Sequence, residues 1–489
     1  MTLKVNDPSD EVRAMSPKWD MVDSLIGGTW AMRNRAETYL QRWPKEELES
    51  YNYRLHSSTL FNALGRTIEN MSSKPFTEPL RYTNIDPTVE SWFDNIDLCG
   101  RNLDMFAYEV FRTGLSYGLT HILVDYPKTV ADDGTPLAIT LADEKAIGAR
   151  PYLIHVEPSA VLGWISSKVQ GVETLMQVRI LEDVNVNDGA FGTTMIQQVR
   201  VLTPGAWQVY RKSTLGSQGG ELWVLFNEGV TSLDYIPLVT FYTRRTGFMQ
   251  AVPPLSDLAD LNVQHWNSSS DQYSILHTAR VPILAITGVS SDSDIKVVVG
   301  AKAALMLPLG ADAKYVEHTG ASIDAGRDSL KDLEEQMRTM GAELLVAQPG
   351  DMTATQSSID TAQAQCQLSQ MASALEDVLD QVIDTMSDWA GLGNQGDIDV
   401  FDDFAAAPIQ GAAVQPFVAA LSVLVASDLL SRESAFSELQ RYGVLNPDLL
   451  WGTESEKIGA VTPALQGNPL ALGDTKPGLP PVITPPLGA

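Results

Sequence analysis

Cysteine is scarce in this chain of 489 residues, and so are closely spaced histidines. The two cysteines, Cys99 and Cys366, lie far apart in the sequence, so they provide neither a disulfide framework nor a zinc-binding spacing. None of the six histidines belongs to an H-E-x-x-H motif or to another metal-ligand pattern. We therefore expect no metal centre and no cofactor, in a protein made in a reducing compartment.

Positively charged side chains are also few. The chain carries 34 Lys and Arg against 61 Asp and Glu, a formal net charge of −27. Between Arg338 and Arg432 there is no Lys or Arg, while that interval holds thirteen Asp and Glu. Tight binding of nucleic acid depends on clustered cations that neutralise phosphates. The composition argues against a nucleic-acid clamp in this interval, and it is compatible with a surface past which DNA slides.

No apolar run is long enough to cross a bilayer. The best candidate, residues 417–430, falls short of the roughly 20 residues that a spanning helix needs, and we expect a buried helix there. The first residues, MTLKVNDPSDEVR, lack an apolar segment, so no signal peptide is expected.

Phosphate-binding loops are missing in the form that nucleotide-binding enzymes need. No G-x-x-x-x-G-K-[ST] motif occurs. Residues 391–396, GLGNQG, match G-x-G-x-x-G, but they follow a helix-like segment and lead into a strand-like one, the reverse of a dinucleotide fingerprint. We interpret them as a linker. Four acidic residues just beyond offer oxygen ligands for a hard cation, although a solvated strand edge is the favoured interpretation. They are Asp397, Asp399, Asp402 and Asp403.

One pattern does point to catalysis. Residues 114–118, GLSYG, match the G-x-S-x-G nucleophile elbow of serine hydrolases, with Ser116 as the nucleophile. An elbow requires a strand before the serine and a helix after it, whereas here helix-like LDMFAYEVFRT precedes and strand-like LTHILVDYP follows. We expect Gly114 and Gly118 to provide a helix C-cap and a turn into the strand. A serine hydrolase using Ser116 remains the alternative, enzymatic hypothesis.

The chain alternates between helical and strand-rich blocks. Residues 1–80 and 88–113 are predicted to be helical, and short runs rich in Val, Ile and aromatics predict strands from 119 to about 245. A helix is expected over 254–277, followed by a small β segment over 281–318. This order is typical of the α+β class.

The clearest helical pattern lies at 321–345. Apolar residues recur there at spacings of three and four and form one seam, which consists of Leu330, Leu333, Met337, Met340 and Leu344. The periodicity alone fits equally well an ordinary helix packed on its own core and a helix packed against copies of itself. Under the second interpretation, Leu333→Asp is expected to weaken self-assembly and to leave the monomer soluble.

The last third of the chain contains a further long helix. A loop at 346–358 precedes it, and an apolar stripe predicts the helix from about Ser358 to Trp389. A strand is expected over DIDVFDDF, and two more helices between 413 and 442. Residues beyond 460 are dense in Pro and Gly, so we expect an extended or disordered tail.

Several long blocks resemble the portal proteins of tailed bacteriophages. They are LFNALGRTIENMSSKPF, LSYGLTHILVDYP, SSSDQYSILHTARVPILAITG and YVEHTGASIDAGRDSLKDLEEQM. With the order of elements, they make roughly residues 20–450 similar to the portal subfamily known as DUF4055. The resemblance implies an α+β portal fold in a ring of typically twelve copies, at one vertex of the capsid in the virion. It also implies that the chain is not an enzyme.

The resemblance assigns a part of the portal fold to each segment. The assignments are 1–253 to the wing, 254–280 to a first stem helix, 281–318 to the clip, 319–345 to a second stem helix, 346–358 to the tunnel loop, 359–412 to a long wing helix and strand, 413–460 to a helical crown and 461–489 to a tail. The implied tunnel loop contains Gln348, Pro349, Gly350, Asp351, Met352 and Thr353. The basic residues then available to a channel are Arg327, Lys331 and Arg338, and the seam at 330–344 becomes the stem seam.

The resemblance also implies partners. They are further copies of the chain, double-stranded DNA passing through the channel without sequence-specific binding, the large terminase, head-completion or adaptor and tail proteins, and the major capsid and scaffold proteins, with no membrane. A third hypothesis is a minor capsid or adaptor protein without a channel. The returning helix pair with an intervening β segment argues against it, because adaptors are usually much shorter.

Overall fold

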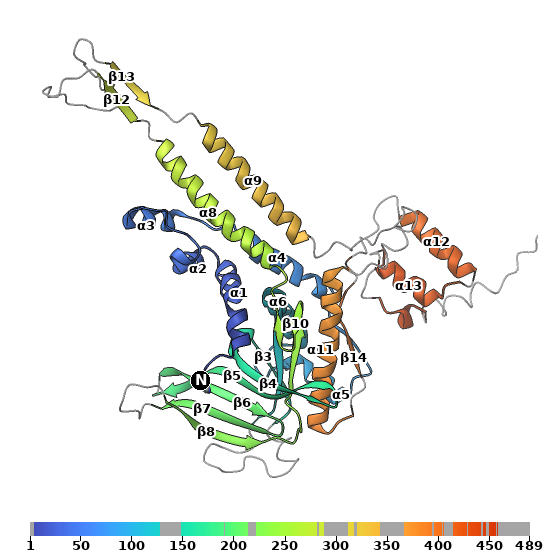
Figure 1. Ribbon diagram of the computed structural model, residues 1–489. Coiled ribbons are helices and arrows are strands. Elements are labelled where there is room, and N and C mark those ends of the chain that lie inside the picture. The colour runs from blue at the N-terminus through green and yellow to red at the C-terminus, as the bar shows by residue number, and fades with distance from the viewer. Residues whose placement is uncertain are drawn as a thin grey trace, which may run out of the picture. The chain divides into compact units, whose positions relative to one another are not determined.

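The computed structural model shows a mixed α/β chain, in agreement with the predicted class (Figure 1). It describes residues 4–127, 148–189, 191–213, 222–280, 283–287, 312–316, 320–342, 366–393, 396–402, 404, 414–427, 429–441, 444–445, 449–455 and 457. The chain divides into two compact units, Met1–Phe404 and Ala405–Ala489. The boundary falls near the start of the segment expected to form a separate helical end.

Helices make up the N-terminal part of the first unit. α1 (Asp10–Ile26) begins after Ser9, whose hydroxyl accepts a hydrogen bond from the N–H of Val12. α6 (Leu103–Tyr117) begins in the same way after Asn102, whose side chain accepts from the N–H of Met105. The other helices here are α2 (Gly28–Arg35), α3 (Leu48–Ser57), α4 (Ala63–Ser72) and α5 (Pro87–Glu90), with 3-10 turns at Ala36–Thr38, Lys74–Phe76 and Phe93–Asn95. The two predicted helical blocks are confirmed.

Two antiparallel sheets form the predicted strand-rich block. The smaller has the order β3-β2-β9, and the larger is a meander from β4 to β8. Their strands are β2 (Leu119–Asp125), β3 (Tyr152–Val156), β4 (Val161–Val169), β5 (Val172–Asp188), β6 (Gly192–Thr203), β7 (Ala206–Ser213), β8 (Leu222–Val230) and β9 (Leu238–Tyr242), with a 3-10 turn at Pro158–Ala160 before β4. One face of the meander packs on the smaller sheet through a cluster that includes Leu123, Val156 and Val178.

Short antiparallel strand pairs complete the first unit. β1 (Arg81–Thr83) pairs with β14 (Asp397–Asp399), which confirms part of the strand expected over DIDVFDDF. β10 (Arg245–Gly247) pairs with β11 (Gln250–Ala251) shortly before the chain enters α8 (Ser256–Ala279). The β1–β14 pairing connects the C-terminal end of this unit to its N-terminal helices.

A helix–strand–helix arrangement follows the sheets. α8 (Ser256–Ala279) and α9 (Ala321–Ala342) run side by side in Figure 1, and between them in the chain lie β12 (Ile283–Thr287) and β13 (Asp312–Val316). The two strands pair antiparallel, from Ile283 opposite Val316 to Thr287 opposite Asp312. The predicted pair of helices with a β segment between them is therefore present.

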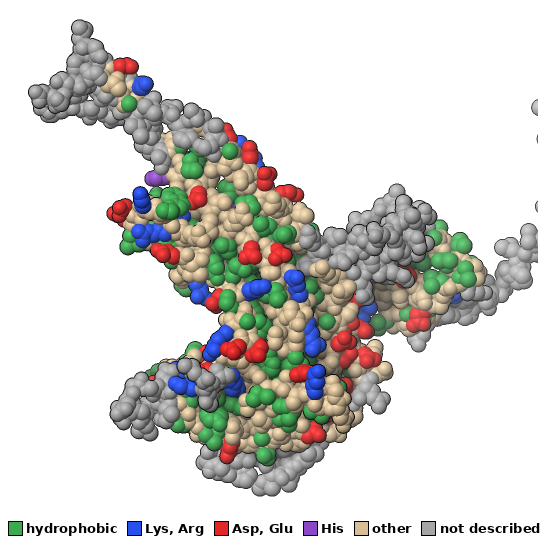
Figure 2. Space-filling view, viewed as in Figure 1, with side chains coloured by type: hydrophobic (Ala, Val, Ile, Leu, Met, Phe, Trp, Pro, Cys, Tyr) green, Lys and Arg blue, Asp and Glu red, His purple; other side chains and the backbone are tan. Residues whose placement is uncertain are grey.

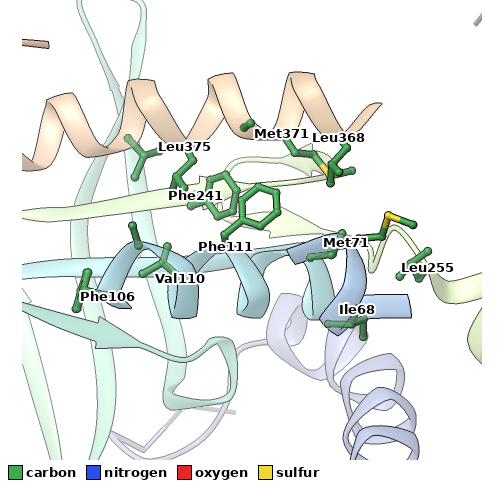
Figure 3. Packing of buried hydrophobic residues seen from close by; sticks show 14 of the residues in the cluster. Ile68, Met71, Phe106, Val110, Phe111, Phe241, Leu255, Leu368, Met371 and Leu375 are labelled. Carbon is green, nitrogen blue, oxygen red and sulfur yellow. The ribbon is translucent and has the colours of Figure 1, made fainter. Parts of the chain in front are cut away.

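The main hydrophobic core joins helices that are far apart in the sequence (Figure 3). α11 (Gln367–Ala390) contributes Leu368, Met371 and Leu375, which pack over side chains of α6 and β9. Phe111 of α6 and Phe241 of β9 face each other there, with ring centroids 5.8 Å apart. The apolar stripe predicted for the long helix before Trp389 is the face of α11 that enters this core.

The second unit contains two described helices. They are α12 (Val414–Ala426) and α13 (Arg432–Arg441), within the segment where two helices were expected. α12 was expected to be buried, but Val418, Val423 and Leu424 keep a large part of their surface exposed. Within the part of the chain that the structure describes, no helix has the length and apolar character needed to cross a membrane.

Candidate functional site: the α8–α9 helix pair

Polar side chains of α8 and α9 come together at two heights along the pair. Near the β12–β13 end, the side-chain amide of Gln272 donates to the carbonyl of Ile323 at 2.8 Å. Farther along, Nε2 of His265 lies 3.6 Å from Oε1 of Glu334. The numbers rise along one helix as they fall along the other, so the two helices are antiparallel. This geometry fixes the register of the pair and leaves β12 and β13 at its far end (Figure 1).

The seam of α9 turns toward the chain's own core in its middle part. Leu333 and Met337 are 7% and 1% exposed, Met337 belongs to the main core, and Met340 packs against that core. Leu330 is half-buried, and Leu344 lies outside the described residues. For Leu333 and Met337 the ordinary core interpretation of the seam is therefore the correct one. The burial of Leu333 changes what is expected of Leu333→Asp, because the substitution would place a charge in a packed interior of the subunit itself.

The three basic residues predicted on α9 are exposed, and carboxylates of the same helix hold them. Arg327 lies 3.2 Å from Asp324, and Arg338 lies 3.2 Å from Glu335. Lys331 lies 3.8 Å from Oδ1 of Asp328. Exposed pairs one helical turn apart stabilise a helix by only about 0.3–0.5 kcal/mol. Their main effect is to offset the positive charge of α9 locally, so the helix presents no unneutralised cationic strip.

An open groove of about 590 Å³ lies between α8 and α9. We call it the acidic groove, and its lining residues are Leu261, Asp332, Glu335, Gln336, Thr339 and Met340. Asp332 has no salt-bridge partner among the residues that the structure describes, unlike the other carboxylates of α9. Figure 2 shows acidic side chains along this helix. The groove therefore combines apolar side chains, Leu261 and Met340, with two carboxylates, of which Glu335 is paired with Arg338 and Asp332 is not paired with a described residue.

His265 lies between the two helices without a hydrogen bond. Neither of its ring nitrogens has a hydrogen-bond partner among the described residues, and its ring centroid is 5.4 Å from that of Phe61. Burial lowers the pKa of His265, and the nearby carboxylate of Glu334 opposes that shift. The imidazole is therefore held mainly in its neutral form, as a packing element rather than as a charged partner of Glu334.

A buried ion pair lies where α3 meets α8. Nη2 of Arg54 is 2.8 Å from Oε2 of Glu46, and both side chains are almost completely buried. The ring of Trp43 covers the guanidinium at 4.3 Å, and the Trp43 indole N–H donates to Asp271 of α8 at 3.2 Å. Cation–π contact and the shared carboxylates satisfy the buried charge. α3 and the segment before it therefore pack on α8, and the sequence pattern did not indicate this contact.

Ser116 does not occupy a nucleophile elbow. It lies inside α6, 4% exposed, and its hydroxyl donates to the carbonyl of Arg112 one turn earlier, at 2.8 Å. Gly118 ends the helix with φ of 92°, so the predicted C-cap is confirmed there. Gly114 is a helical residue instead, and a Cβ at this position would come within 2.4 Å of the Phe241 ring. The G-x-S-x-G spacing therefore results from close packing and a helix cap.

The remaining sequence candidates fall into two groups. The implied tunnel-loop residues 348–353 and the tail 461–489 lie outside the described residues. Of the four acidic residues considered as cation ligands, Asp397 and Asp399 are exposed residues of β14, Asp402 is half-buried, and Asp403 lies outside the described residues. No group of three or more metal-ligating side chains is present in the described part of the chain.

A family model covers the segment that carries this site. Residues 254–390 match the "Domain of unknown function (DUF4055)". The matched segment runs from α8 through β12, β13 and α9 to the end of α11. It accounts for the helix pair and the long core helix, and it leaves the two sheets outside. Among curated proteins, none matches the chain.

Several solved structures are similar to a larger part of the chain, at low sequence identity. One is the "Virion of native gene transfer agent (GTA) particle", at 12% identity over 83% of this chain and 98% of that chain, with a TM-score of 0.41. Another is the "Neck of native GTA particle computed with C12 symmetry", at 13% identity over 83% and 98%, with a TM-score of 0.40. A third is the "Neck of empty GTA particle computed with C6 symmetry", at 12% identity over 77% and 89%, with a TM-score of 0.38.

The sequence pattern brought out the helices of this site but not the groove between them. Leu330, Leu333, Met337 and Met340 stood out by their spacing, and two of them proved to be core residues. Asp332 and Glu335 had the pattern of an ordinary solvated face. Their place in the groove depends on Leu261 of α8, 71 positions before Asp332, which only the folded chain brings near.

Proposed function

We propose that this chain is the portal protein of a tailed phage or phage-like particle. In this proposal several copies form a ring at one vertex of the capsid, and portal proteins typically have twelve copies in the ring. The ring is the channel through which double-stranded DNA enters and leaves. The chain is a structural and assembly protein without catalytic activity of its own.

The observation that carries the proposal is the helix–strand–helix arrangement from α8 to α9. The portal resemblance requires two antiparallel stem helices with a β-rich clip between them, followed by a long helix in the body of the subunit. The chain has α8 and α9 antiparallel, β12 and β13 paired between them, and α11 in the main core. The DUF4055 match spans these same elements.

The charge distribution supports a conduit rather than a DNA-binding surface. Each copy carries −27, and the cations of α9 are paired with carboxylates of the same helix. A lining without free cations does not retain the phosphates of DNA, because tight retention needs charge neutralisation at many contacts. Non-sequence-specific passage of DNA is the behaviour expected of such a surface.

The absence of a hydrolase site at Ser116 supports the non-enzymatic part of the proposal. A serine nucleophile needs an exposed hydroxyl beside a general base. The Ser116 hydroxyl instead donates to a backbone carbonyl inside α6. ATP-driven packaging is then the work of the large terminase.

The other proposed partners follow from the arrangement of the ring. The β12–β13 end is the proposed docking site of the terminase and later of head-completion, adaptor or tail proteins. The sheets and N-terminal helices are proposed to face the major capsid and scaffold proteins. Virion location at the portal vertex is part of the same proposal.

Native mass spectrometry and negative-stain electron microscopy of the purified full chain test it. We expect a ring of about twelve copies with a central hole, formed alone or after addition of the phage's scaffold and capsid proteins. A protein that stays monomeric under both conditions would contradict the proposal. A compact monomer that hydrolyses a simple ester would support the Ser116 alternative instead.

A further inference from the structure

The imidazole of His265 is enclosed between α8 and its neighbours without a hydrogen bond. The residue is 4% exposed, and neither Nδ1 nor Nε2 has a hydrogen-bond partner among the described residues. The next residue, Trp266, is completely buried, and its indole N–H also lacks a partner in the described part of the chain. Buried polar atoms of native proteins are almost always hydrogen-bonded. The two ring nitrogens of His265 therefore call for an explanation.

Other buried polar side chains of α8 bind the segments that surround the helix. Asn262 uses both ends of its amide in bonds to the chain around α4, and Gln272 donates to a carbonyl of α9. His265 instead packs its ring on that of Phe61 and comes only within 3.6 Å of Glu334. Its position in the helix pair therefore suits an uncharged ring, which needs neither a counter-ion nor an acceptor for two N–H groups.

The charges around the imidazole are few. Glu334 of α9, one-third exposed, is the only described charged side chain that shifts its pKa, and burial outweighs this carboxylate. From the side of α4, the ring of Phe61 faces the imidazole, and the guanidinium of Arg66 lies over the same Phe61 ring at 5.6 Å. The nearest carboxylates of α8 itself, Asp260 and Asp271, are more than one helical turn away along the sequence.

Protonation upsets this arrangement. A protonated imidazole donates from both nitrogens and carries a positive charge. Glu334 is within reach of Nε2, but the N–H at Nδ1 has no acceptor among the described residues. A buried charge with an unsatisfied donor is costly, and the cost is removed when the ring reaches water. The ring reaches water only if the packing around it loosens.

We propose that His265 is an acid-sensitive joint between α8 and α9. A neutral ring lets the two helices pack, and a protonated ring weakens the packing of α9 on α8 at this point. The joint belongs to the single subunit and does not depend on a ring of copies. Its consequence for the β12–β13 end, which lies at the far end of the helix pair (Figure 1), rests on the proposed function, in which that end docks partner proteins.

The direction of the effect follows from proton linkage. When the pair is open, the imidazole titrates near 6.5, as in an unfolded chain. When the pair is closed, burial holds the pKa of His265 below that value. The open state therefore binds the proton first as the pH falls, and opening becomes more favourable below about pH 6.5. Between pH 7.5 and 5.5, one histidine raises the equilibrium constant for opening by up to about tenfold.

Hydrogen–deuterium exchange of the full chain, measured by mass spectrometry, tests the joint. Most helical stability in proteins comes from tertiary packing, so the amides of α9 exchange faster when its packing weakens. After correction for the intrinsic pH dependence of exchange, we expect peptides from 329–342 to lose protection by up to about tenfold between pH 7.5 and 5.5. His265→Phe keeps an aromatic ring beside Phe61 that cannot take up a proton, and it is expected to abolish this loss.

The matched control is a second histidine of the same helix. His277 is exposed and contacts the ring of Tyr53, so His277→Phe keeps an aromatic contact and removes a solvated imidazole. It is expected to lose protection in 329–342 as the wild type does. A wild type without the acid effect, or a His265→Phe variant that keeps it in full, would overturn the inference.

Glu334→Gln gives a second test, which remains decisive if His265→Phe does not fold. The carboxylate is the group that makes a buried imidazolium less costly. Without it the closed state resists protonation more strongly, so the acid-induced loss of protection is expected to be larger than in the wild type. If the carboxylate of Glu334 were itself the titrating group, this variant would reduce or abolish the loss, and that result would contradict the assignment to His265.

These measurements separate the joint from the proposed function. An acid effect that is absent, or that does not depend on His265, would remove the inference and leave the portal proposal standing. A chain that forms no ring under any condition but shows the expected exchange in the wild type and the variants would contradict the portal proposal and support the joint.

Discussion

Arg54 and Glu46 face each other at 2.8 Å, with only 3% and 2% of their side chains exposed. The pair sits where α3 meets α8, and Ser270 and Asp271 of α8 lie within reach of the same guanidinium. A buried pair of this kind adds little stability over an apolar substitute, but loss of one partner leaves an uncompensated charge.

Arg54→Leu is expected to lower the free energy of unfolding by about 3–5 kcal/mol, because Glu46 remains buried without its counter-ion. Urea unfolding followed by tryptophan fluorescence measures the change. Arg54→Leu combined with Glu46→Leu is expected to recover most of the loss. A double variant as unstable as the single one would contradict the assignment. Arg13→Ala, which removes an exposed pair with Asp10, is the control and should change stability by less than about 1 kcal/mol.

Leu333→Asp is expected to destabilise the folded subunit rather than the contact between copies. The side chain is buried next to Met337, so the substitution places an unpaired charge in a packed interior. We expect loss of the cooperative unfolding transition or a fall of several kcal/mol in its free energy. Ser329→Asp introduces the same charge at an exposed position of α9 and is expected to be tolerated. Wild-type stability of the Leu333→Asp subunit would contradict the core interpretation of the seam and would favour a seam that contacts other copies.

Ser116→Ala is expected to be nearly silent. It removes one local hydrogen bond to the carbonyl of Arg112, worth about 0.5–1.5 kcal/mol, and no reactive group. Ring yield should be unchanged. Hydrolysis of p-nitrophenyl acetate, measured by absorbance, should stay at the background rate for both the wild type and the variant. A wild-type rate well above background that Ser116→Ala abolishes would refute the structural interpretation of α6.

Two histidines of the smaller sheet, His121, which is buried, and His155, which is half-buried, make this region sensitive to acid. Burial lowers the pKa of His121 to about 3 and that of His155 to about 4. Their rings form hydrogen bonds of 2.9 Å with the hydroxyls of Thr240 and Thr120. In the unfolded chain both titrate near 6.5, so the unfolded state binds protons first as the pH falls. Stability is therefore lost progressively below about pH 6.5, and the loss continues until the folded-state pKa values are reached.

The size of this effect is testable by urea unfolding at pH 7, 6 and 5. Each histidine contributes up to about 1.4 kcal/mol per pH unit. His121→Gln and His155→Gln keep a hydrogen-bonding side chain but cannot take up the proton. The double variant is expected to lose less stability between pH 7 and 5 than the wild type does. His56→Gln, at an exposed position, is the control and should follow the wild type. An equal loss in the double variant and the wild type would contradict the assignment.

Local patterns in the sequence predicted most of the elements because their causes are local. The spacing of apolar residues in α9 and α11, and the left-handed glycine after α6, act over one or two turns. β4 lies within the stretch expected to contain strands, but its own sequence, VLGWISSKV, does not mark it as one, because it lacks a regular alternation and carries Gly163 and two serines. Its strand conformation comes from pairing with β5 and from the N–H of Ser9, which donates to the carbonyl of Leu162 at 2.7 Å.

The candidate site was predictable only in part, since its chemistry depends on distant segments. The helix pair was visible as two helix-like stretches with a β segment between them, and 321–345 showed a clear apolar period. The surface against which the α9 seam packs was not visible, because the same spacing fits a core and a contact between copies. The packing of Met337 in the main core decides between them. The partnership of Trp43 with Asp271 joins residues 228 positions apart, and no pattern in either neighbourhood indicates it.

Asn262 uses both ends of its buried amide to join α8 to the chain around α4, accepting from the N–H of Leu64 and donating to the carbonyl of Phe61. α8 is therefore attached to the N-terminal helices at two points, here and where Arg54 reaches Ser270. A sideways force on the β12–β13 end acts on these contacts with a lever arm equal to the length of α8 between them and that end. This length grows by about 1.5 Å for each residue. Force applied at that end is therefore carried into the N-terminal helices through a few buried amide and guanidinium contacts.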